Sequence, residues 1–191
     1  MIVCTWNYRG AGKKGFSSLI KDLVYQNKVQ VLVLLETRIS GRKADKVVRN
    51  LGFDSFFLRE AAGFSGGIWI LWNKNIATVR ILEEDHQFVH SKIVWVDSGL
   101  EELFTFVYAS PRRMERKVLW DNLRSLASVG GKWATMGDFN VYMEEGEKQG
   151  GAVVNWDSIQ DFNSCLSDCG LSDLGASGPM FTWRRGLYRR N

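Results

Sequence analysis

The order of apolar periodicities along this chain limits the folds that it can adopt. Residues 2–6 predict a strand, and the apolar side chains of residues 16–24 fall on one face of a predicted helix. Residues 29–35 form an almost continuous run of Val and Leu, which is typical of a strand buried on both faces. A second helix is predicted near residues 44–51. The N-terminal part of the chain therefore predicts two βα units.

The remainder of the chain combines a strand-rich centre with further helices. Strands are predicted at residues 67–72, 77–82, 91–96, 103–108, 134–136 and 180–183, and helices near residues 118–126 and 157–169. Two βα units, a run of antiparallel strands and further αβ units indicate an α/β fold whose sheets are covered by helices. The length of 191 residues suits a single domain, residues 1–191, that can bury a full core.

Composition limits the partners and the compartment of the protein. The net charge of +4 suits a polyanionic partner without requiring one. The three cysteines form no disulfide framework, and Cys165 and Cys169 share an apolar helix face, which predicts core thiols. The longest apolar run, residues 29–35, is too short to cross a bilayer, and the N-terminus lacks a secretory pattern. We therefore expect an intracellular protein with no membrane partner.

Three of the predicted strands end in short carboxylate or amide side chains. Asn7 follows the first strand, Glu36 follows the buried Val and Leu run, and Asp138 and Asn140 follow Gly137 after the strand at residues 134–136. We expect these side chains to meet at one end of a sheet. Clusters of oxygen ligands of this kind bind Mg2+ and position phosphate groups.

Phosphodiester hydrolysis gives each of these groups a role. It needs a metal ion that offsets the phosphate charge, an oriented water, and donors to the transition state. Glu36 is the best candidate metal ligand, and Asn7 could bridge metal and phosphate. Asp138 and Asn140 lie two apart on a predicted extended segment, so that the carboxylate can orient water while the amide donates to phosphate. The alternatives are a paired glutamate at a strand end and an Asx turn.

A tyrosine and several basic residues are further candidates. Tyr108 ends a strand just before Pro111, where its phenol could donate to a phosphate or pack under the turn. Arg9 and Lys13 lie in the loop beside the candidate site, and Arg112 follows the Tyr108 turn. These cations could contact a nucleic-acid backbone, and the alternative is a set of solvated surface charges.

A glycine-rich motif offers a different function. Gly10, Gly12 and Gly15 match the G-x-G-x-x-G pattern of a dinucleotide-binding loop, and Glu36 stands where that fold places a ribose-binding carboxylate. The bulky residues 6–9, however, crowd the turn before the glycines. The strand-rich centre also differs from a doubly wound parallel sheet. These features disfavour a dinucleotide-binding oxidoreductase.

Six short motifs occur in order across the chain and together resemble a known family. The motifs are Trp6-Asn7-x-Arg9-Gly10-x-Gly12, Leu35-Glu36-Thr37-Arg38, Ser65-Gly66-Gly67, Tyr108-Ala-Ser-Pro111, Gly137-Asp138-Phe139-Asn140 and Gly178-Pro-x-Phe-Thr182-Trp183. This set resembles the endonuclease domain of plant LINE-type (non-LTR) retrotransposons. That domain is similar to apurinic endonucleases and DNase I, in the endonuclease/exonuclease/phosphatase superfamily.

The resemblance implies a fold and an activity. The implied fold is a DNase I-like four-layer α/β sandwich, in which two packed mixed β-sheets are flanked by helices and the site lies at one edge of the sheets. The implied activity is nicking of DNA with Mg2+, or Mn2+ in its place, which leaves a 3′ hydroxyl that primes reverse transcription. The family further implies a former fusion to a reverse transcriptase and action in the nucleus, and we expect a monomer.

The resemblance also implies roles for individual residues. Glu36 resembles the metal carboxylate of the family, with Asn7 as its neighbour at the metal and the phosphate. Tyr108 resembles the tyrosine that contacts the transition state. Asp138 matches the residue that aligns the attacking water, and Asn140 matches the residue that holds the scissile phosphate.

Contacts to the nucleic-acid backbone form a separate group of implied roles. Thr182 occupies a position where such domains contact that backbone, and we expect Arg9, Lys13 and Arg112 to contribute to the same binding.

The chain departs from the family near its end. The family's Leu-Asp-Arg segment and Ser-Asp-His motif have no counterpart after Trp183, and His86 and His90 are expected on the surface or at a strand edge before the strand at residues 91–96. We therefore expect a domain that is incomplete at its C-terminus, lacks its last strands, leaves a sheet edge open and has impaired activity. The alternatives are a catalytically inert retroelement remnant or nucleic-acid-binding module, and a phosphatase or RNA nuclease of the same superfamily.

Overall fold

The computed structural model describes residues 1–63, 66–151, 153–178 and 181. The strands are β1 (Val3–Asn7), β2 (Val31–Leu35), β3 (Ser55–Arg59), β4 (Ile68–Trp72), β5 (Ala77–Asp85), β6 (Phe88–Trp95), β7 (Glu101–Tyr108) and β8 (Trp133–Asp138). The helices are α1 (Phe16–Asn27), α2 (Gly41–Arg49), α3 (Arg113–Ala127) and α4 (Trp156–Asp168), with a short 3-10 helix, η1 (Glu145–Glu147). In the described part of the chain, no helix is long and apolar enough to cross a membrane.

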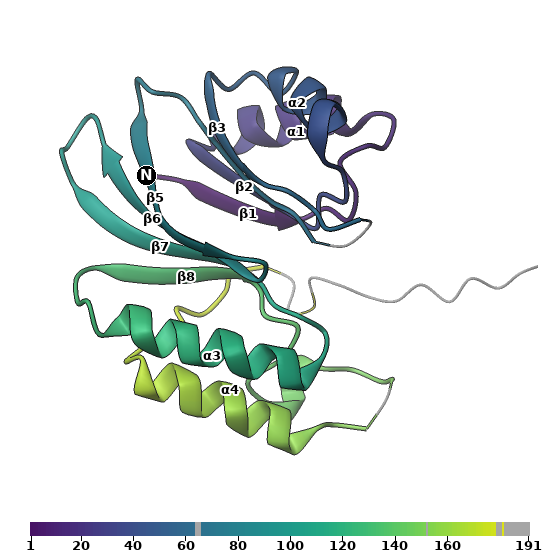
Figure 1. Cartoon of the computed structure of the whole chain (residues 1–191), viewed down its shortest axis with the longest axis vertical. Coiled ribbons are helices and arrows are strands. Elements are labelled where there is room, and N and C mark those ends of the chain that lie inside the picture. The colour runs from purple at the N-terminus through teal and green to yellow at the C-terminus, as the bar shows by residue number, and fades with distance from the viewer. Residues whose placement is uncertain (64–65, 152, 179–180, 182–191) are drawn as a thin grey trace, which may run out of the picture.

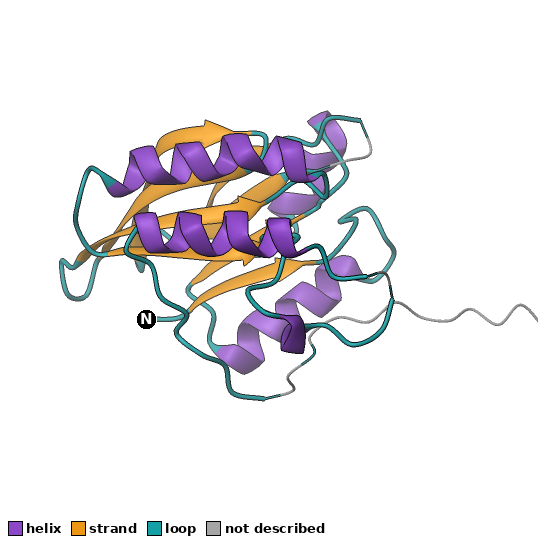
Figure 2. Ribbon diagram, turned by 90° about the horizontal axis from the view of Figure 1, so that it is seen from below, coloured by secondary structure: helices purple, strands orange, loops and turns teal. Residues whose placement is uncertain are grey.

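The molecule has four layers, as the sequence predicted. One sheet has the strand order β1-β2-β4-β3 and the other has the order β5-β6-β7-β8. Both sheets are mixed, because β1–β2 and β7–β8 are parallel pairs and the other pairs are antiparallel. Helices α1 and α2 cover the outer face of the first sheet, and α3 and α4 cover that of the second (Figure 1). Viewed from below, α3 and α4 lie side by side across their sheet (Figure 2).

Strand β2 shows why the apolar pattern produces this layering. All five of its side chains are fully buried. Leu32 and Leu34 pack against α1 and α2, whereas Val31, Val33 and Leu35 pack against the second sheet. Full burial stabilises the fold by about 1.5–3 kcal/mol for each such side chain. The prediction of a strand buried on both faces is confirmed.

The strand registers bring four strand ends together. Asn7 at the end of β1 is paired with Leu35 at the end of β2, and Tyr108 at the end of β7 is paired with Asp138 at the end of β8. Strands β1 and β8 are edge strands of different sheets, and they contact each other across the sandwich. The side chains that follow these strands therefore converge on one edge of the two packed sheets.

Strand β3 and the start of β6 were not predicted. In β3, Phe56 and Leu58 pack toward the helices while Phe57 packs toward the other sheet, so apolar residues on both faces hide the alternation. Strand β6 begins at Phe88, before the expected residue 91. The strand predicted at residues 180–183 lies outside the described residues, apart from Phe181.

The cysteines lie where the sequence predicted. Cys165 is fully buried between α4 and the second sheet, and Cys169 is half-buried against the same cluster. Their sulfur atoms are 4.0 Å apart, which is a hydrogen-bond contact between two free thiols and not a disulfide. Burial raises the pKa of the Cys165 thiol to about 12, so that both packing and protonation make it an apolar core residue.

Candidate active site

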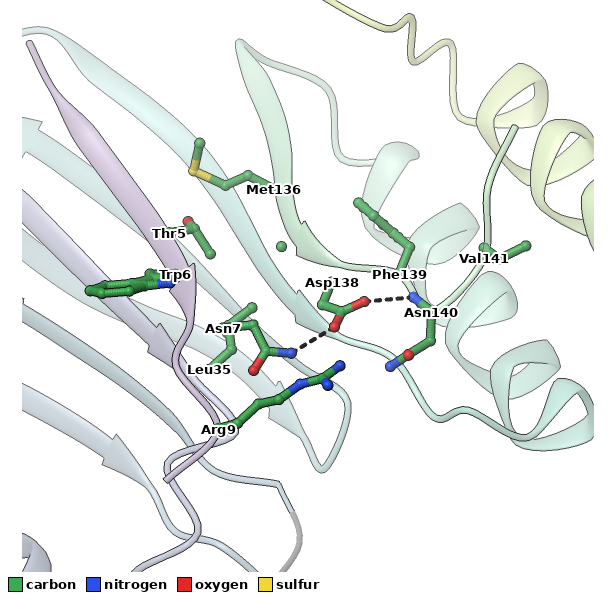
Figure 3. Close-up of a pocket in the computed structure, with 11 residues that line it drawn as sticks. Thr5, Trp6, Asn7, Arg9, Leu35, Met136, Asp138, Phe139, Asn140 and Val141 are labelled. Atoms are coloured by element: carbon green, nitrogen blue, oxygen red, sulfur yellow. Dashed lines mark hydrogen bonds between the residues drawn. The ribbon is translucent and has the colours of Figure 1, made fainter. Parts of the chain in front are cut away.

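A pocket of about 710 Å3 opens between the ends of β1 and β8 (Figure 3). It is lined by Thr5, Trp6, Asn7, Arg9, Leu35, Met136, Gly137, Asp138, Phe139, Asn140 and Val141. The polar side chains Asn7, Asp138 and Asn140 stand at its mouth, while Met136 and Phe139 provide apolar walls. Three of the predicted catalytic residues thus share one pocket.

Glycine 137 lets β8 approach β7 closely enough to form this site. Its φ angle is +148°, and a Cβ atom added there would lie 2.0 Å from the carbonyl oxygen of Val107. No side chain fits at that distance, so the position requires glycine. The next residue, Asp138, then lies directly opposite Tyr108.

The Asp138 carboxylate is held by a donor on each oxygen. The side-chain amide of Asn7 donates to Oδ2 at 2.6 Å, and the backbone N–H of Asn140 donates to Oδ1 at 3.0 Å (Figure 3). The Asn140 amide donates to the carbonyl oxygen of Ala109 at 2.6 Å, and the Ala109 N–H donates back to the Asp138 carbonyl at 2.8 Å. One hydrogen-bond donor on each oxygen therefore fixes the orientation of the carboxylate.

The expected extended geometry between Asp138 and Asn140 is wrong. Strand β8 ends at Asp138, and Asn140 has a φ angle of +49° in the left-handed region. Asparagine tolerates this region because its short side chain bonds locally. The two side chains line the same pocket because the chain turns here, and not because they alternate along a strand.

Glu36 is buried and paired with two arginines. Only 6% of this residue is exposed, and Arg9 Nε lies 3.2 Å from Oε2. Arg38 donates to Oε1 through its guanidinium. A buried carboxylate needs such partners, because removing its charge from water is costly. The alternative of a paired glutamate at a strand end thus describes the contacts that Glu36 makes here.

Unusual backbone angles concentrate at this site. Of the five non-glycine residues with positive φ in the described ranges, four are Arg9, Glu36, Arg38 and Asn140, with φ between 49° and 59°. Such angles cost of order 1–3 kcal/mol each and are typical of functional sites, where the surroundings enforce them. This clustering points to the same site as the strand ends do, by an independent observation.

Tyr108 lies near both carboxylates. Its phenol is hydrogen-bonded to the Glu36 carboxylate. Burial, followed by the negative charge of Glu36, this hydrogen bond and the charge of Asp138, raises the pKa of Tyr108 to about 12. The phenol is therefore a protonated donor throughout the neutral range. Packing beneath the turn, the alternative use of this residue, does not account for its contact with Glu36.

The donor set suits a divalent cation of the Mg2+ type. Mg2+ is usually held by one or two carboxylates together with substrate phosphate and several waters. The Oδ1 atom of Asn7 is buried without a hydrogen-bond partner among the described residues, and Glu36 follows the residue paired with Asn7. Within those residues no group of three or more His, Cys, Asp or Glu could form a closed protein cage. An ion held by Glu36 and Asn7 would therefore keep positions open for water and for a phosphate oxygen.

The predicted nucleic-acid contacts are only partly brought together. Arg9 lines the pocket, whereas Lys13 lies 5.6 Å from the centre of the Tyr8 ring, in the loop after β1. Arg112 lies at the start of α3, where it pairs with Glu115 at 2.8 Å. Thr182 lies outside the described residues.

Sequence reasoning assigned no role to Arg38. It lies in the quoted Leu35–Arg38 motif, two residues after Glu36, and that spacing on a turn was the available signal. Its guanidinium contact with Glu36 depends on its φ angle of +59°, which the sequence does not reveal.

The two histidines lie away from the pocket. His90 belongs to β6 and is buried, so its expected place before the strand and on the surface or at a strand edge is wrong. Its Nδ1 lies 2.8 Å from the Thr105 hydroxyl, which satisfies the buried ring. Burial lowers the pKa of the His90 imidazole, an effect that the charge of Glu83 opposes. His86 is mostly exposed and lies 2.8 Å from a carboxylate oxygen of Asp85.

The comparison with family models decides the family. Residues 4–189 match the model of the Endonuclease/Exonuclease/phosphatase family. The chain belongs to this family. Endonucleases, exonucleases and phosphatases all hydrolyse phosphate esters, so the family is one of hydrolases. A search of curated proteins found no matching sequence.

Solved structures show the same fold. The AP endonuclease LMAP from Leishmania major is similar with a TM-score of 0.64 and 15% identity, covering 87% of this chain and 66% of that one. The endonuclease domain of TRAS1, a telomere-specific non-LTR retrotransposon, has a TM-score of 0.67 and 15% identity, and the match covers 92% of this chain and 75% of that one. An AP endonuclease from Archaeoglobus fulgidus has a TM-score of 0.62 and 15% identity, and the match covers 87% of this chain and 70% of that one. This chain thus spans about two thirds to three quarters of each of these neighbours.

Proposed function

We propose that this member of the endonuclease/exonuclease/phosphatase family is a Mg2+-dependent endonuclease that nicks DNA, of the kind found in plant LINE-type retrotransposons. The observation that supports it most directly is that two interacting pairs of side chains meet at four neighbouring strand ends. Asn7 donates to Asp138 in the pocket, and Tyr108, which is paired with Asp138 across the strands, interacts with Glu36. The similarity to a retrotransposon endonuclease domain supports the choice of DNA.

Each side chain has a task in phosphodiester hydrolysis. Glu36 and the free Oδ1 of Asn7 would hold Mg2+, which supplies positive charge to offset that of the phosphate. Asp138, oriented through both of its oxygens, accepts a hydrogen bond from the attacking water and aligns it. The second N–H of the Asn140 amide would donate to a phosphate oxygen, and the Tyr108 hydroxyl would turn from Glu36 to donate to another.

The arginines around Glu36 add positive charge at the same place. Arg9 and Arg38 contact opposite oxygens of the Glu36 carboxylate. A guanidinium forms paired hydrogen bonds with phosphate as readily as with carboxylate. If Glu36 served as a metal ligand, the Arg9 and Arg38 guanidiniums beside it would be in position to donate to the phosphate.

A nucleic-acid-binding module without catalysis is the second candidate. It is favoured by the positions of the two histidines, neither of which lines the pocket within the described part of the chain. A site that used no histidine would have one common donor fewer at the transition state. A retroelement remnant that still binds DNA would have this character.

Nicking of supercoiled plasmid in Mg2+, compared with EDTA, tests the proposal. The variant Asp138→Asn keeps the size of the side chain but removes its charge, and Asp97→Asn is its control on an exposed turn at the other end of the sheets. We expect metal-dependent nicking that Asp138→Asn abolishes and Asp97→Asn retains. Equal nicking by all three proteins would indicate a contaminating nuclease and contradict the proposal.

The same proteins distinguish the remaining functions. DNA binding without nicking would favour the inert module. Release of phosphate from a simple phosphomonoester, or cleavage of RNA in preference to DNA, would favour the alternative activities of the family. We propose action on DNA in the nucleus by a monomer, and an origin beside a reverse transcriptase, on the basis of the family resemblance.

A further inference from the structure

Positive charge is strongly segregated along this chain. Residues 9–49 contain ten of the 25 Lys and Arg side chains but only three of the 21 Asp and Glu. The rest of the chain contains more acidic than basic side chains. The net positive charge of the protein therefore belongs to one part of the structure: the loop after β1, helices α1 and α2, and the segments that join them.

The loop after β1 and the helix α2 form one surface. A Cβ atom added at Gly12 would lie 3.2 Å from Lys43 Nζ and 3.3 Å from the Ile39 side chain. The Lys43 ammonium therefore lies against the loop that also holds Lys13 and Lys14. Helix α2 begins five residues after Glu36, so this surface starts next to the candidate active site.

Helix α2 presents a line of cations to solvent. Ala44 and Val48 are buried against the first sheet, and Arg42, Lys46 and Arg49 are exposed at the spacing i, i+4, i+7, which places them on one side of the helix. From Arg42 to Arg49 the helix rises about 10 Å. This length matches about three phosphates along one strand of duplex DNA.

These cations lack the carboxylate partners seen elsewhere in the protein. Within the described ranges, no ion pair involves Lys13, Lys14, Arg42, Lys43 or Lys46.

The nearby acids and an arginine of helix α3 make the contrast clear. Asp45 is the one acidic residue of α2, and Glu60 accepts a hydrogen bond from the Gly41 N–H at 2.7 Å. By contrast, Arg113 of α3 pairs with both Asp157 and Asp161. The positive charge of α2 is therefore available to an external polyanion.

We propose that the exposed cations of the loop and of α2, the basic face, bind the phosphate backbone of duplex DNA beside the scissile phosphate. The basic face comprises Lys13, Lys14, Arg42, Lys43, Lys46 and Arg49. The choice of DNA rests on the proposed function, whereas the preference for a polyanion rests on the unpaired charges. Contacts of this type give affinity that is independent of base sequence and falls steeply with salt.

A charge-matched pair of triple variants tests the basic face. Arg42→Gln/Lys43→Gln/Lys46→Gln removes three cations from α2. The control, Lys74→Gln/Arg80→Gln/Lys132→Gln, removes three exposed cations elsewhere. Lys74 follows β4 and Lys132 precedes β8, both at the strand ends opposite the pocket.

Fluorescence anisotropy with a labelled duplex in EDTA, at several salt concentrations, measures binding without cleavage. Each phosphate contact contributes about −0.9 to the slope of log affinity against log salt. We expect the α2 variant to make this slope shallower by about 2–3 and to lower affinity at about 0.1 M salt by roughly 100-fold. The control should keep the wild-type slope. Thermal unfolding of all three proteins confirms that exposed substitutions leave the fold intact.

The outcomes separate this inference from the proposed function. Equal slopes for the α2 variant and its control would overturn the basic face, even if the wild-type protein nicks plasmid. A loss of DNA affinity and of salt dependence in the α2 variant, but not in its control, would uphold the basic face. This holds even if no nicking is observed and the proposed function fails. Tighter binding of duplex RNA than of duplex DNA, at equal salt, would overturn the assignment of DNA.

Discussion

The close approach of β8 to β7 makes Gly137 the position where a single methyl group should do most damage. A Cβ atom there would lie 2.0 Å from the Val107 carbonyl oxygen and 2.8 Å and 2.9 Å from two further backbone atoms of Val107. Backbone cannot rotate away as a side chain can, so the strands must separate. We estimate about 1–3 kcal/mol for this overpacking and about 1–2 kcal/mol for the positive φ of a non-glycine residue. Gly137→Ala should therefore cost roughly 2–5 kcal/mol, a large part of a typical domain stability.

A second glycine separates the two contributions. Gly130 also has a positive φ, +75°, but a Cβ added there would meet nothing within 4 Å. Gly130→Ala should therefore cost only the conformational part, about 1–2 kcal/mol. Urea unfolding of both variants gives the difference directly, and the melting temperature of Gly137→Ala should be lower by about 2–4 °C for each extra kcal/mol. If the two variants were equally stable, the argument from the β7–β8 contact would be refuted.

Four further predictions concern the site itself. Tyr108 has a pKa of about 12, above its usual value of 10, so the folded protein keeps a proton that the unfolded chain loses; stability should fall as pH rises from about 10 to 12, and Tyr108→Phe should flatten that fall in urea unfolding. Glu36→Ala should weaken Mg2+ binding by at least about tenfold in calorimetry, and unchanged affinity would contradict its assignment as a ligand. Arg38→Gln should tighten Mg2+ binding several-fold without DNA, because it removes a cation from Glu36; weaker binding would show that Arg38 supports the metal site. Asn7→Ala removes the 2.6 Å bond to Asp138 and should slow nicking roughly tenfold to hundredfold, whereas an unchanged rate would deny that bond a role.

The layers of this fold were largely readable in the sequence. The Val and Leu run of β2 predicted a strand covered on both faces, because burial on two sides removes the polar alternation. The apolar run before Gly137 predicted the strand at residues 134–136, which lies within β8, although the extended segment expected beyond it ends at Asp138. The same reasoning failed for β3, where Phe56, Phe57 and Leu58 are apolar on both faces within a strand of five residues. Periodicity reports which faces are buried, and it is uninformative where both are buried over a short span.

The sequence by itself determined which chemical groups stand at the strand ends, since that depends only on local patterns of apolar residues, glycines and acids. Tertiary structure alone decided which of these groups meet. Asn7 and Asp138 are 131 residues apart and touch because two edge strands from different sheets lie together. The pairing of Glu36 with Arg9 depends on left-handed backbone angles that these residue types do not signal. The pairing of Glu36 with Arg38 depends on such an angle as well. Contacts between layers arise when whole sheets pack, so no local pattern in the chain encodes them.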